Sequence, residues 1–229
     1  MLKNFLILII AIIPVITSHS GINNYSPDTL TPTDTTKSQK YIKYSPEEIP
    51  KLSYQNFVSF LTHKVNDLTL LFGSYRPELK EHSEKKDFGQ RLLVFNDKNE
   101  IVFTSIGAQD SRSFYPSYFK SDDLSPIFLL VELGDEGGTW GNLVFTISGN
   151  TIKYIGSIDL AIPEKNDCEL TYYDISEYTE ISKSGNKYRF DFKADTITYK
   201  PLRSDYEKNI NAKEWYYLYD NDTLKLMKK

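Results

Sequence analysis

Residues 127–148 read "IFLLVELGDEGGTWGNLVFTIS", and this stretch decides the fold. The first part, "IFLLVEL", is apolar almost throughout, which is typical of a strand that is covered on both faces. The connector "GDEGGTWGN", Gly134 to Asn142, follows, and "LVFTIS" resumes the apolar pattern. We therefore expect a central strand, a glycine-rich connector and a second strand.

The same pattern of an apolar run, a short polar turn and a second apolar run recurs on both sides of this stretch. It occurs in "LLVF-NDKNE-IVFTSI", "LVFTI-SGN-TIKYIGSIDL", "YTEIS-KSGN-KYRFDF" and "WYYLYD-ND-TLKLM". Gly149 and Gly185 supply the positive φ that tight hairpin turns require. These signals predict an antiparallel meander.

One helix is expected before the meander. Ser45, followed by a proline and two glutamates, resembles a helix N-cap, although Pro50 can move the start to Ser53. Apolar side chains then follow helical spacing at Phe57, Phe60, Leu61 and Val65. His63 falls on the polar flank, where we expect it to be exposed. The next stretch, "LTLLFGSY", fits either a continued helix or a strand.

These patterns together predict an α+β fold. It consists mainly of a twisted antiparallel β-sheet, a meander curled toward a half-barrel, with the N-terminal helix packed on it. We expect residues 45–229 to form this single domain. Residues 21–44, rich in Thr, Ser and Pro, are expected to be a flexible tether.

Residues 1–20 have the pattern of a signal peptide. Lys3 precedes an apolar run over residues 5–16, and small residues follow at Ser18 and Ser20. The run is shorter than the about 20 residues that span a bilayer, so we expect no transmembrane helix after cleavage. The protein is then secreted or periplasmic, and its richness in Asn, Lys, Ile and Tyr suggests a bacterial source.

Charge and cysteine content narrow the function classes. A net charge of −4 with mixed signs provides no basic surface for nucleic acid, so we expect no nucleic-acid partner. Cys168 is the single cysteine and cannot form an intramolecular disulfide. Its role stays open between a partly buried small side chain, an exposed thiol and an intermolecular bridge.

Catalytic and cofactor signatures are missing from the sequence. We find no GxSxG, no HExxH and no phosphate-binding glycine loop, and a single cysteine excludes a thiolate zinc cluster. We therefore predict no catalytic residues, no cofactor and no metal. Calcium at Asp135 and Glu136 would need six to eight oxygen ligands, and the Asp/Asn ladder of an EF-hand is absent.

Six residues are the candidate binding residues: Asp135, Glu136, Trp140, Trp215, Tyr217 and Tyr219. The first two belong to the connector, and the stronger explanation of this stretch is a strand connection that needs glycines to adopt unusual φ and ψ. Trp140 either covers the end of the core or offers a ring for stacking. Trp215, Tyr217 and Tyr219 share one strand face and are either core residues or a platform for sugars.

Two functions fit these observations. The first is an exported, non-catalytic protein that binds a protein or glycan partner through aromatic sheet and loop surfaces. The alternative is a carboxylate-dependent hydrolase that uses Glu132, Asp135 and Glu136, provided that two of these acids converge in a pocket.

Overall fold

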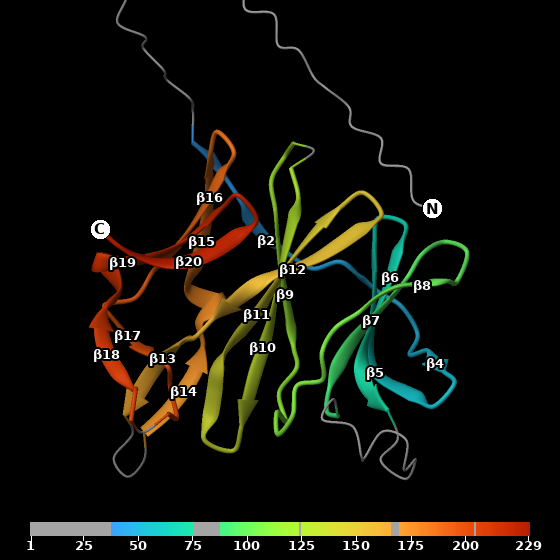
Figure 1. The fold of residues 1–229 in the computed structure, drawn as a ribbon, viewed down its shortest axis with the longest axis horizontal. Helices are drawn as coiled ribbons and strands as arrows, with labels where there is room; N and C mark the ends of the chain where they lie inside the picture. Colours follow the sequence, from blue (N-terminus) through green and yellow to red (C-terminus); the bar gives the residue numbers. More distant parts are fainter. Residues whose placement is uncertain (1–37, 76–87, 124, 166–169, 204) are drawn as a thin grey trace, which may run out of the picture. The chain divides into compact units, whose positions relative to one another are not determined.

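In the computed structural model, residues 127–148 form two long antiparallel strands, β10 (Ile127–Asp135) and β11 (Gly138–Ser148), in the middle of the fold (Figure 1). Side chains alternate along a strand, so Phe128 and Leu130 point to one side of β10 while Leu129 and Val131 point to the other. All four are fully buried. The expectation of a central strand covered on both faces is confirmed.

The structure describes residues 38–75, 88–123, 125–165, 170–203 and 205–229, and the element counts below refer to these residues. They belong to one compact unit, Thr36–Lys229. The expected signal peptide, residues 21–37 of the expected tether, and Cys168 lie outside the described residues.

Three sheets make up this unit. The central sheet contains, in spatial order, β18 (Lys208–Asn211), β17 (Thr196–Tyr199), β13 (Leu160–Lys165), β14 (Leu170–Asp174), β11, β10, β9 (Pro116–Lys120) and β2 (Ile42–Tyr44), with β12 (Thr151–Ile158) also paired to β11. The C-terminal sheet contains β1 (Gln39–Lys40), β15 (Thr179–Ser184), β16 (Lys187–Phe192), β19 (Trp215–Asp220) and β20 (Thr223–Lys228). The N-terminal sheet contains β3 (Glu47–Glu48), β5 (Phe57–Val65), β6 (Leu68–Tyr75), β7 (Arg91–Phe95) and β8 (Ile101–Thr104), with β4 (Ser53–Tyr54) paired to β5.

The pairing is antiparallel, as expected, apart from one parallel contact between β11 and β14 at Gly138 and Tyr172. The four predicted hairpins are present as β7–β8, β11–β12, β15–β16 and β19–β20. The mainly antiparallel β-sheet is therefore confirmed, although the strands are divided among three sheets.

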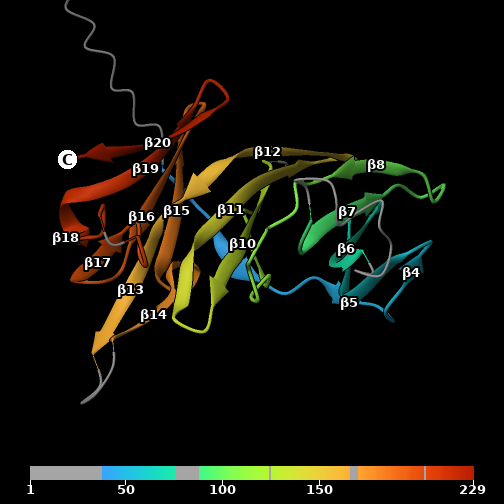
Figure 2. The ribbon, with the colours of Figure 1, turned by 60° about the horizontal axis from the view of Figure 1, so that its bottom comes forward.

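The central sheet lies between the other two, which Figure 2 shows from a second side. Between the central and C-terminal sheets lies the half-barrel core, which includes Phe128, Leu130 and Phe190. A second core, between the central and N-terminal sheets, includes Leu129 and Phe145. The covers of the central strand are thus two sheets, not a helix.

The central sheet curls around the half-barrel core. Leu160 of β13 and Ile197 of β17, near one end of the sheet, are buried in the same cluster as Phe128 in its middle. A flat sheet would hold these residues several strand spacings, of about 4.8 Å each, apart. The predicted curl toward a half-barrel is therefore present.

The predicted N-terminal helix is wrong. Residues 45–65 form β3, β4 and β5, and the described residues contain no α-helix, only the short 3-10 turns η1 (Ile175–Tyr178) and η2 (Ala212–Glu214). A β-bulge explains the misleading spacing, because the register of β5 against β6 shifts between Ser59 and Leu61. Phe60 is the extra residue, and it turns a period of two into an apparent helical period. The fold class is therefore mainly β rather than α+β.

The expected tether is too long at its C-terminal end. Gln39–Lys40 pairs with β15 and Ile42–Tyr44 pairs with β9. Tyr41 between them is buried in the half-barrel core, with its ring centroid 5.3 Å from that of Phe128. This aromatic side chain holds the segment in place, so the folded part extends to residues before Ser45.

We predict that Phe128→Ala lowers the free energy of unfolding by about 3–5 kcal/mol, because it leaves a cavity in a well-packed core. Phe128 is fully buried, and its ring centroid lies 5.0 Å from that of Tyr188 and 5.1 Å from that of Phe190. Denaturant titration measures this change. As a control, Ile106→Ala removes a side chain that is 68% exposed and should cost less than about 0.5 kcal/mol. Equal losses in both variants would contradict the packing described here.

Candidate functional site

One face of β11 points into the half-barrel core, and we call it the inner face. It carries both apolar and polar side chains along its length. The residues that share the face of Val144, a member of the half-barrel core, are Asn142, Thr146 and Ser148. The other face, with Leu143, Phe145 and Ile147, is apolar throughout. The half-barrel core is therefore apolar in its middle and bordered by polar side chains at both ends.

One polar end opens into a cavity of about 590 Å³, which we call the mouth groove. Its lining comes from the ends of β11 and β12 and from the turns of the β15–β16 and β19–β20 hairpins. Barrel mouths are common positions for binding sites, because the strand ends bring side chains from many elements together.

Two tyrosines, Tyr188 and Tyr219, line the mouth groove. Their ring centroids are 5.9 Å apart and their planes differ by 32°. Both rings are half-buried and lie against Phe128, at centroid distances of 5.0 and 6.2 Å. The core thus holds the two rings in place from behind, which limits the entropy lost when a ligand contacts them.

Neutral hydrogen-bonding groups surround these rings. Thr146, Ser148 and Thr151 contribute hydroxyl groups, and Asn186 and Asn221 contribute side-chain amides. Hydroxyls and amides both donate and accept, so they can match the hydroxyl groups of a ligand in either sense.

The charged groups of the mouth groove are paired with each other. Lys153 Nζ lies 2.8 Å from Asp222 Oδ2, and the Tyr219 hydroxyl donates to Asp222 Oδ1 at 3.0 Å. Burial, the hydrogen bond to Asp222 and the charge of Asp222 together raise the pKa of Tyr219 to about 12. The phenol therefore remains protonated at neutral pH, and the groove offers no unpaired charge among its described lining residues.

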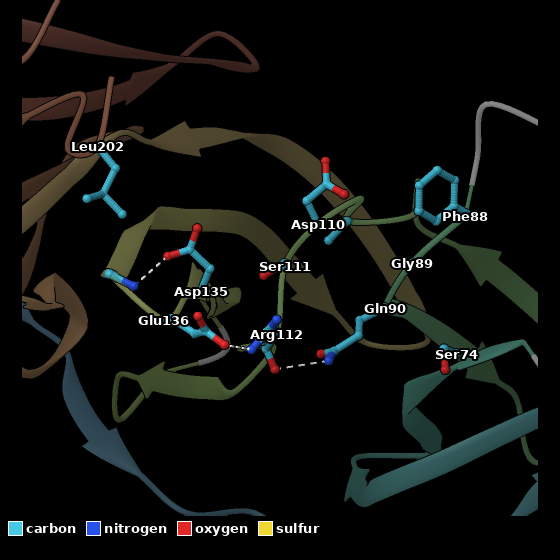
Figure 3. Close-up of a pocket in the computed structure, with 12 residues that line it drawn as sticks. Ser74, Phe88, Gly89, Gln90, Asp110, Ser111, Arg112, Asp135, Glu136 and Leu202 are labelled. Carbon is cyan, nitrogen blue, oxygen red and sulfur yellow. Dashed lines mark hydrogen bonds and ion pairs between the residues drawn. The ribbon is translucent and has the colours of Figure 1, made fainter. Parts of the chain in front are cut away.

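The predicted acids Asp135 and Glu136 lie elsewhere, in a second cavity of about 750 Å³ that we call the turn groove (Figure 3). Asp110 and Arg112 also line it. Glu136 forms an ion pair with Arg112, and Asp135 Oδ1 accepts a hydrogen bond of 2.7 Å from Gly137 N. The two predicted carboxylates are thus close to each other, but each already has a partner.

The glycines of the connector have a structural explanation. Gly138 adopts a φ of +110°, and a Cβ there would lie 2.4 Å from the carbonyl oxygen of Tyr172. Gly141 adopts a φ of +134°, and a Cβ there would lie 2.2 Å from the carbonyl oxygen of Ile158. Close approach of neighbouring strands therefore requires glycine at both positions.

The predicted aromatic binding residues do not lie together in one site. Trp140 is half-buried at a β-bulge, where the β10–β11 register shifts, and it lines neither groove. Trp215 is half-buried, with Lys228 Nζ 5.8 Å from its ring centroid. Tyr217 is 5% exposed within the half-barrel core, and its hydroxyl accepts from Asp159 N at 3.2 Å. Of the candidate aromatic residues, only Tyr219 lines the mouth groove.

Sequence reasoning missed most of the mouth groove. In "KYRFDF", Tyr188 alternates with Phe190 and therefore follows the pattern of a core residue, and Asn186 and Asn221 belong to the hairpin turns "KSGN" and "ND". The available signal was the replacement of apolar residues by Thr146 and Ser148 on one face of "LVFTIS".

Glu132 is separated from the other two acids that were considered for hydrolysis. It lies on the inner face of β10, directly opposite Asn142, and it does not line the turn groove. Burial and the negative charge of Asp174 raise its pKa to about 7. Its neighbours belong to the second polar end of the half-barrel core, which is described below.

Two further observations concern metals and membranes. Within the described ranges, no group of three or more His, Cys, Asp or Glu side chains is placed to hold a metal ion. The part of the chain that the structure describes also contains no helix that is long and apolar enough to cross a membrane.

Comparison with known proteins gives no relative from which a function can be inferred: no family model, curated protein or solved structure matches the chain. The geometry of the site is therefore the basis for the function proposed below.

His63 differs from its expected position on the exposed flank of a helix. It lies on β5, is half-buried, and its Nδ1 is 2.9 Å from the hydroxyl of the buried Tyr118. Burial lowers the pKa of His63, and the charge of Glu48 opposes this effect in part. The neutral imidazole is therefore the form that fits the folded protein.

We predict that His63 makes the protein less stable in mild acid. The folded state takes up the proton less readily than the unfolded state, so the stability is present above about pH 6.5 and is lost as the pH falls. Urea unfolding at pH 7.5 and pH 5.0 should show a smaller loss in His63→Gln than in the wild type. Identical losses in the two proteins would show that His63 does not contribute.

Proposed function

We propose that this chain is an exported, non-catalytic binding protein that holds a neutral glycan in the mouth groove. The observation that carries this proposal is the pair of fixed rings, Tyr188 and Tyr219, inside a border of hydroxyl and amide side chains. The expected signal peptide at residues 1–20 would bring the groove into contact with extracellular or periplasmic glycans.

The chemistry of the groove matches a sugar. Pyranose rings have apolar faces formed by C–H groups, and flat aromatic rings cover such faces while excluding water. The hydroxyls of Thr146, Ser148 and Thr151 surround the rings and can bond the equatorial hydroxyls of the same sugar. A purely apolar ligand would leave these polar groups without partners.

Charge favours a neutral ligand. Lys153 and Asp222 are the charged residues among the described lining residues, and they neutralise each other. A charged ligand would have to compete with this ion pair, whereas a neutral ligand leaves it intact.

The hydrolase alternative has less support. Glu132 lies apart from Asp135 and Glu136, and Glu136 is already paired with Arg112. In the mouth groove, Asp222 is the single carboxylate among the described lining residues, and Tyr219 and Lys153 both bind it. Glycoside hydrolysis usually needs a second carboxyl group about 5–9 Å away.

We predict that the protein binds neutral oligosaccharides and that Tyr219→Ala weakens this binding at least about tenfold, which corresponds to about 1.4 kcal/mol. Asn186→Ala should also weaken it, and this exposed turn position leaves the core unchanged. An array of neutral oligosaccharides identifies the ligand, and titration calorimetry measures the affinity of each variant.

Tyr206→Ala is the matched control, because Tyr206 is 67% exposed and does not line the mouth groove. It should bind as the wild type does. Failure of every neutral oligosaccharide to bind, or equal affinity of Tyr219→Ala and Tyr206→Ala, would refute the proposed function. Capture of a protein partner through other surfaces would instead support a binding protein whose partner is a protein and not a glycan.

A further inference from the structure

The second polar end of the half-barrel core contains five side chains that we call the acid cluster: Glu132, Asn142, Asp174, Ser117 and Ser176. They come from β10, β11, the end of β14, β9 and η1. Asn142 and Ser148 face the same side of β11 and are separated along the strand, which rises about 3.3 Å per residue. This end is therefore about 20 Å from the Ser148 end of the mouth groove. The acid cluster is therefore separate from the proposed glycan site.

Hydrogen bonds fix Asp174 as an acceptor. Its Oδ1 accepts from Asn142 Nδ2 at 2.9 Å and from the backbone N–H of Ser176 at 3.0 Å. Its Oδ2 accepts from the Ser176 hydroxyl, and the Ser117 hydroxyl lies 2.9 Å from that of Ser176. The carboxylate of Asp174 therefore accepts three hydrogen bonds, one from Asn142 and two from Ser176.

The side-chain oxygen of Asn142 has no partner. Asn142 is 1% exposed, and its Oδ1 is buried without a hydrogen bond among the described residues. The opposite amide orientation is disfavoured, because it would place Oδ1 against the carboxylate of Asp174. Since Oδ1 and Nδ2 share one carbon atom, the unpartnered oxygen lies next to the amide nitrogen that donates to Asp174.

Glu132 adds a second carboxyl group on the same face. It is directly opposite Asn142 in the β10–β11 ladder, where facing Cβ atoms are about 4.5–5.5 Å apart. Among the described residues, no side chain forms an ion pair with Glu132 or Asp174. Two carboxyl groups and a carbonyl oxygen thus lie together, and no basic side chain in the described part of the chain is paired with either carboxyl group.

We propose that the acid cluster binds a calcium ion, with Glu132 and Asn142 Oδ1 as direct ligands beside the carboxylate of Asp174. All of these donors are hard oxygens, which is the ligand type of Ca²⁺, and two carboxylates balance its charge. Calcium accepts six to eight oxygens in irregular geometry, so water completes the shell that the strands leave open. The cation also satisfies the unpartnered oxygen of Asn142.

The test is thermal unfolding of the full chain after treatment with EGTA, with and without about 5 mM CaCl₂. Bound calcium stabilises the folded state, so the Tm of the wild type should rise by about 3–6 °C. Glu132→Gln should lose this rise. Glu136→Gln, the same change at an exposed acid of the turn groove, should keep it in full.

Titration calorimetry of the wild type provides a second measurement that does not depend on the folding of any variant. It should show one calcium per chain, and MgCl₂ in place of CaCl₂ should bind more weakly. The proposal is overturned if calcium neither raises the Tm nor gives a binding signal, or if Glu132→Gln keeps the full rise. An increase in the stability of Glu132→Gln in EGTA together with no calcium effect would show that a proton balances the charge instead, and this too overturns it.

Discussion

The burial of both faces of the β10–β11 hairpin is the constraint on which the rest of the structure depends. An antiparallel sheet commonly has one face in water, but here the C-terminal sheet covers one face and the N-terminal sheet covers the other. The side chains in the middle of β10 must therefore all be apolar. Phe128 contacts aromatic rings from three other segments, those of Tyr41, Tyr188 and Tyr219, and so joins the start of the folded chain to its C-terminal hairpins.

The polar groups on the inner face of β11 lie on either side of Val144, which is buried in the half-barrel core. At one end, Thr146 and Ser148 meet the hairpin turns of the C-terminal sheet and form the mouth groove. At the other end, Asn142 meets Asp174 and Glu132 in the acid cluster. A buried polar group needs a partner, so each end either contains its own partners or has room for a ligand. The buried Ser176 hydroxyl, which donates to Asp174, is an example of the first case, and the unpartnered oxygen of Asn142 is an example of the second.

The hairpins could be predicted because their signals are local. Alternating side chains and turn residues such as Gly149 and Gly185 act within a few positions. The helix at residues 45–65 was predicted wrongly, because the β-bulge at Phe60 depends on the partner strand β6, which a local spacing rule does not include. For the same reason the folded part begins earlier than expected. The residues next to Tyr41 in the sequence form no pattern that predicts a strand. Tyr41 is held by its contact with Phe128, which is distant along the chain.

The sequence by itself determined where the strands and turns of the four predicted hairpins lie, and that the strand at residues 127–133 is covered on both faces. Only the tertiary structure decided what covers it and which polar side chains meet. Tyr188 and Tyr219, or Glu132 and Asp174, are brought together by strand pairing and by the curl of the central sheet. The physical reason is that alternation specifies the face of a side chain, whereas the sheet that packs against that face depends on contacts between residues that are distant in sequence.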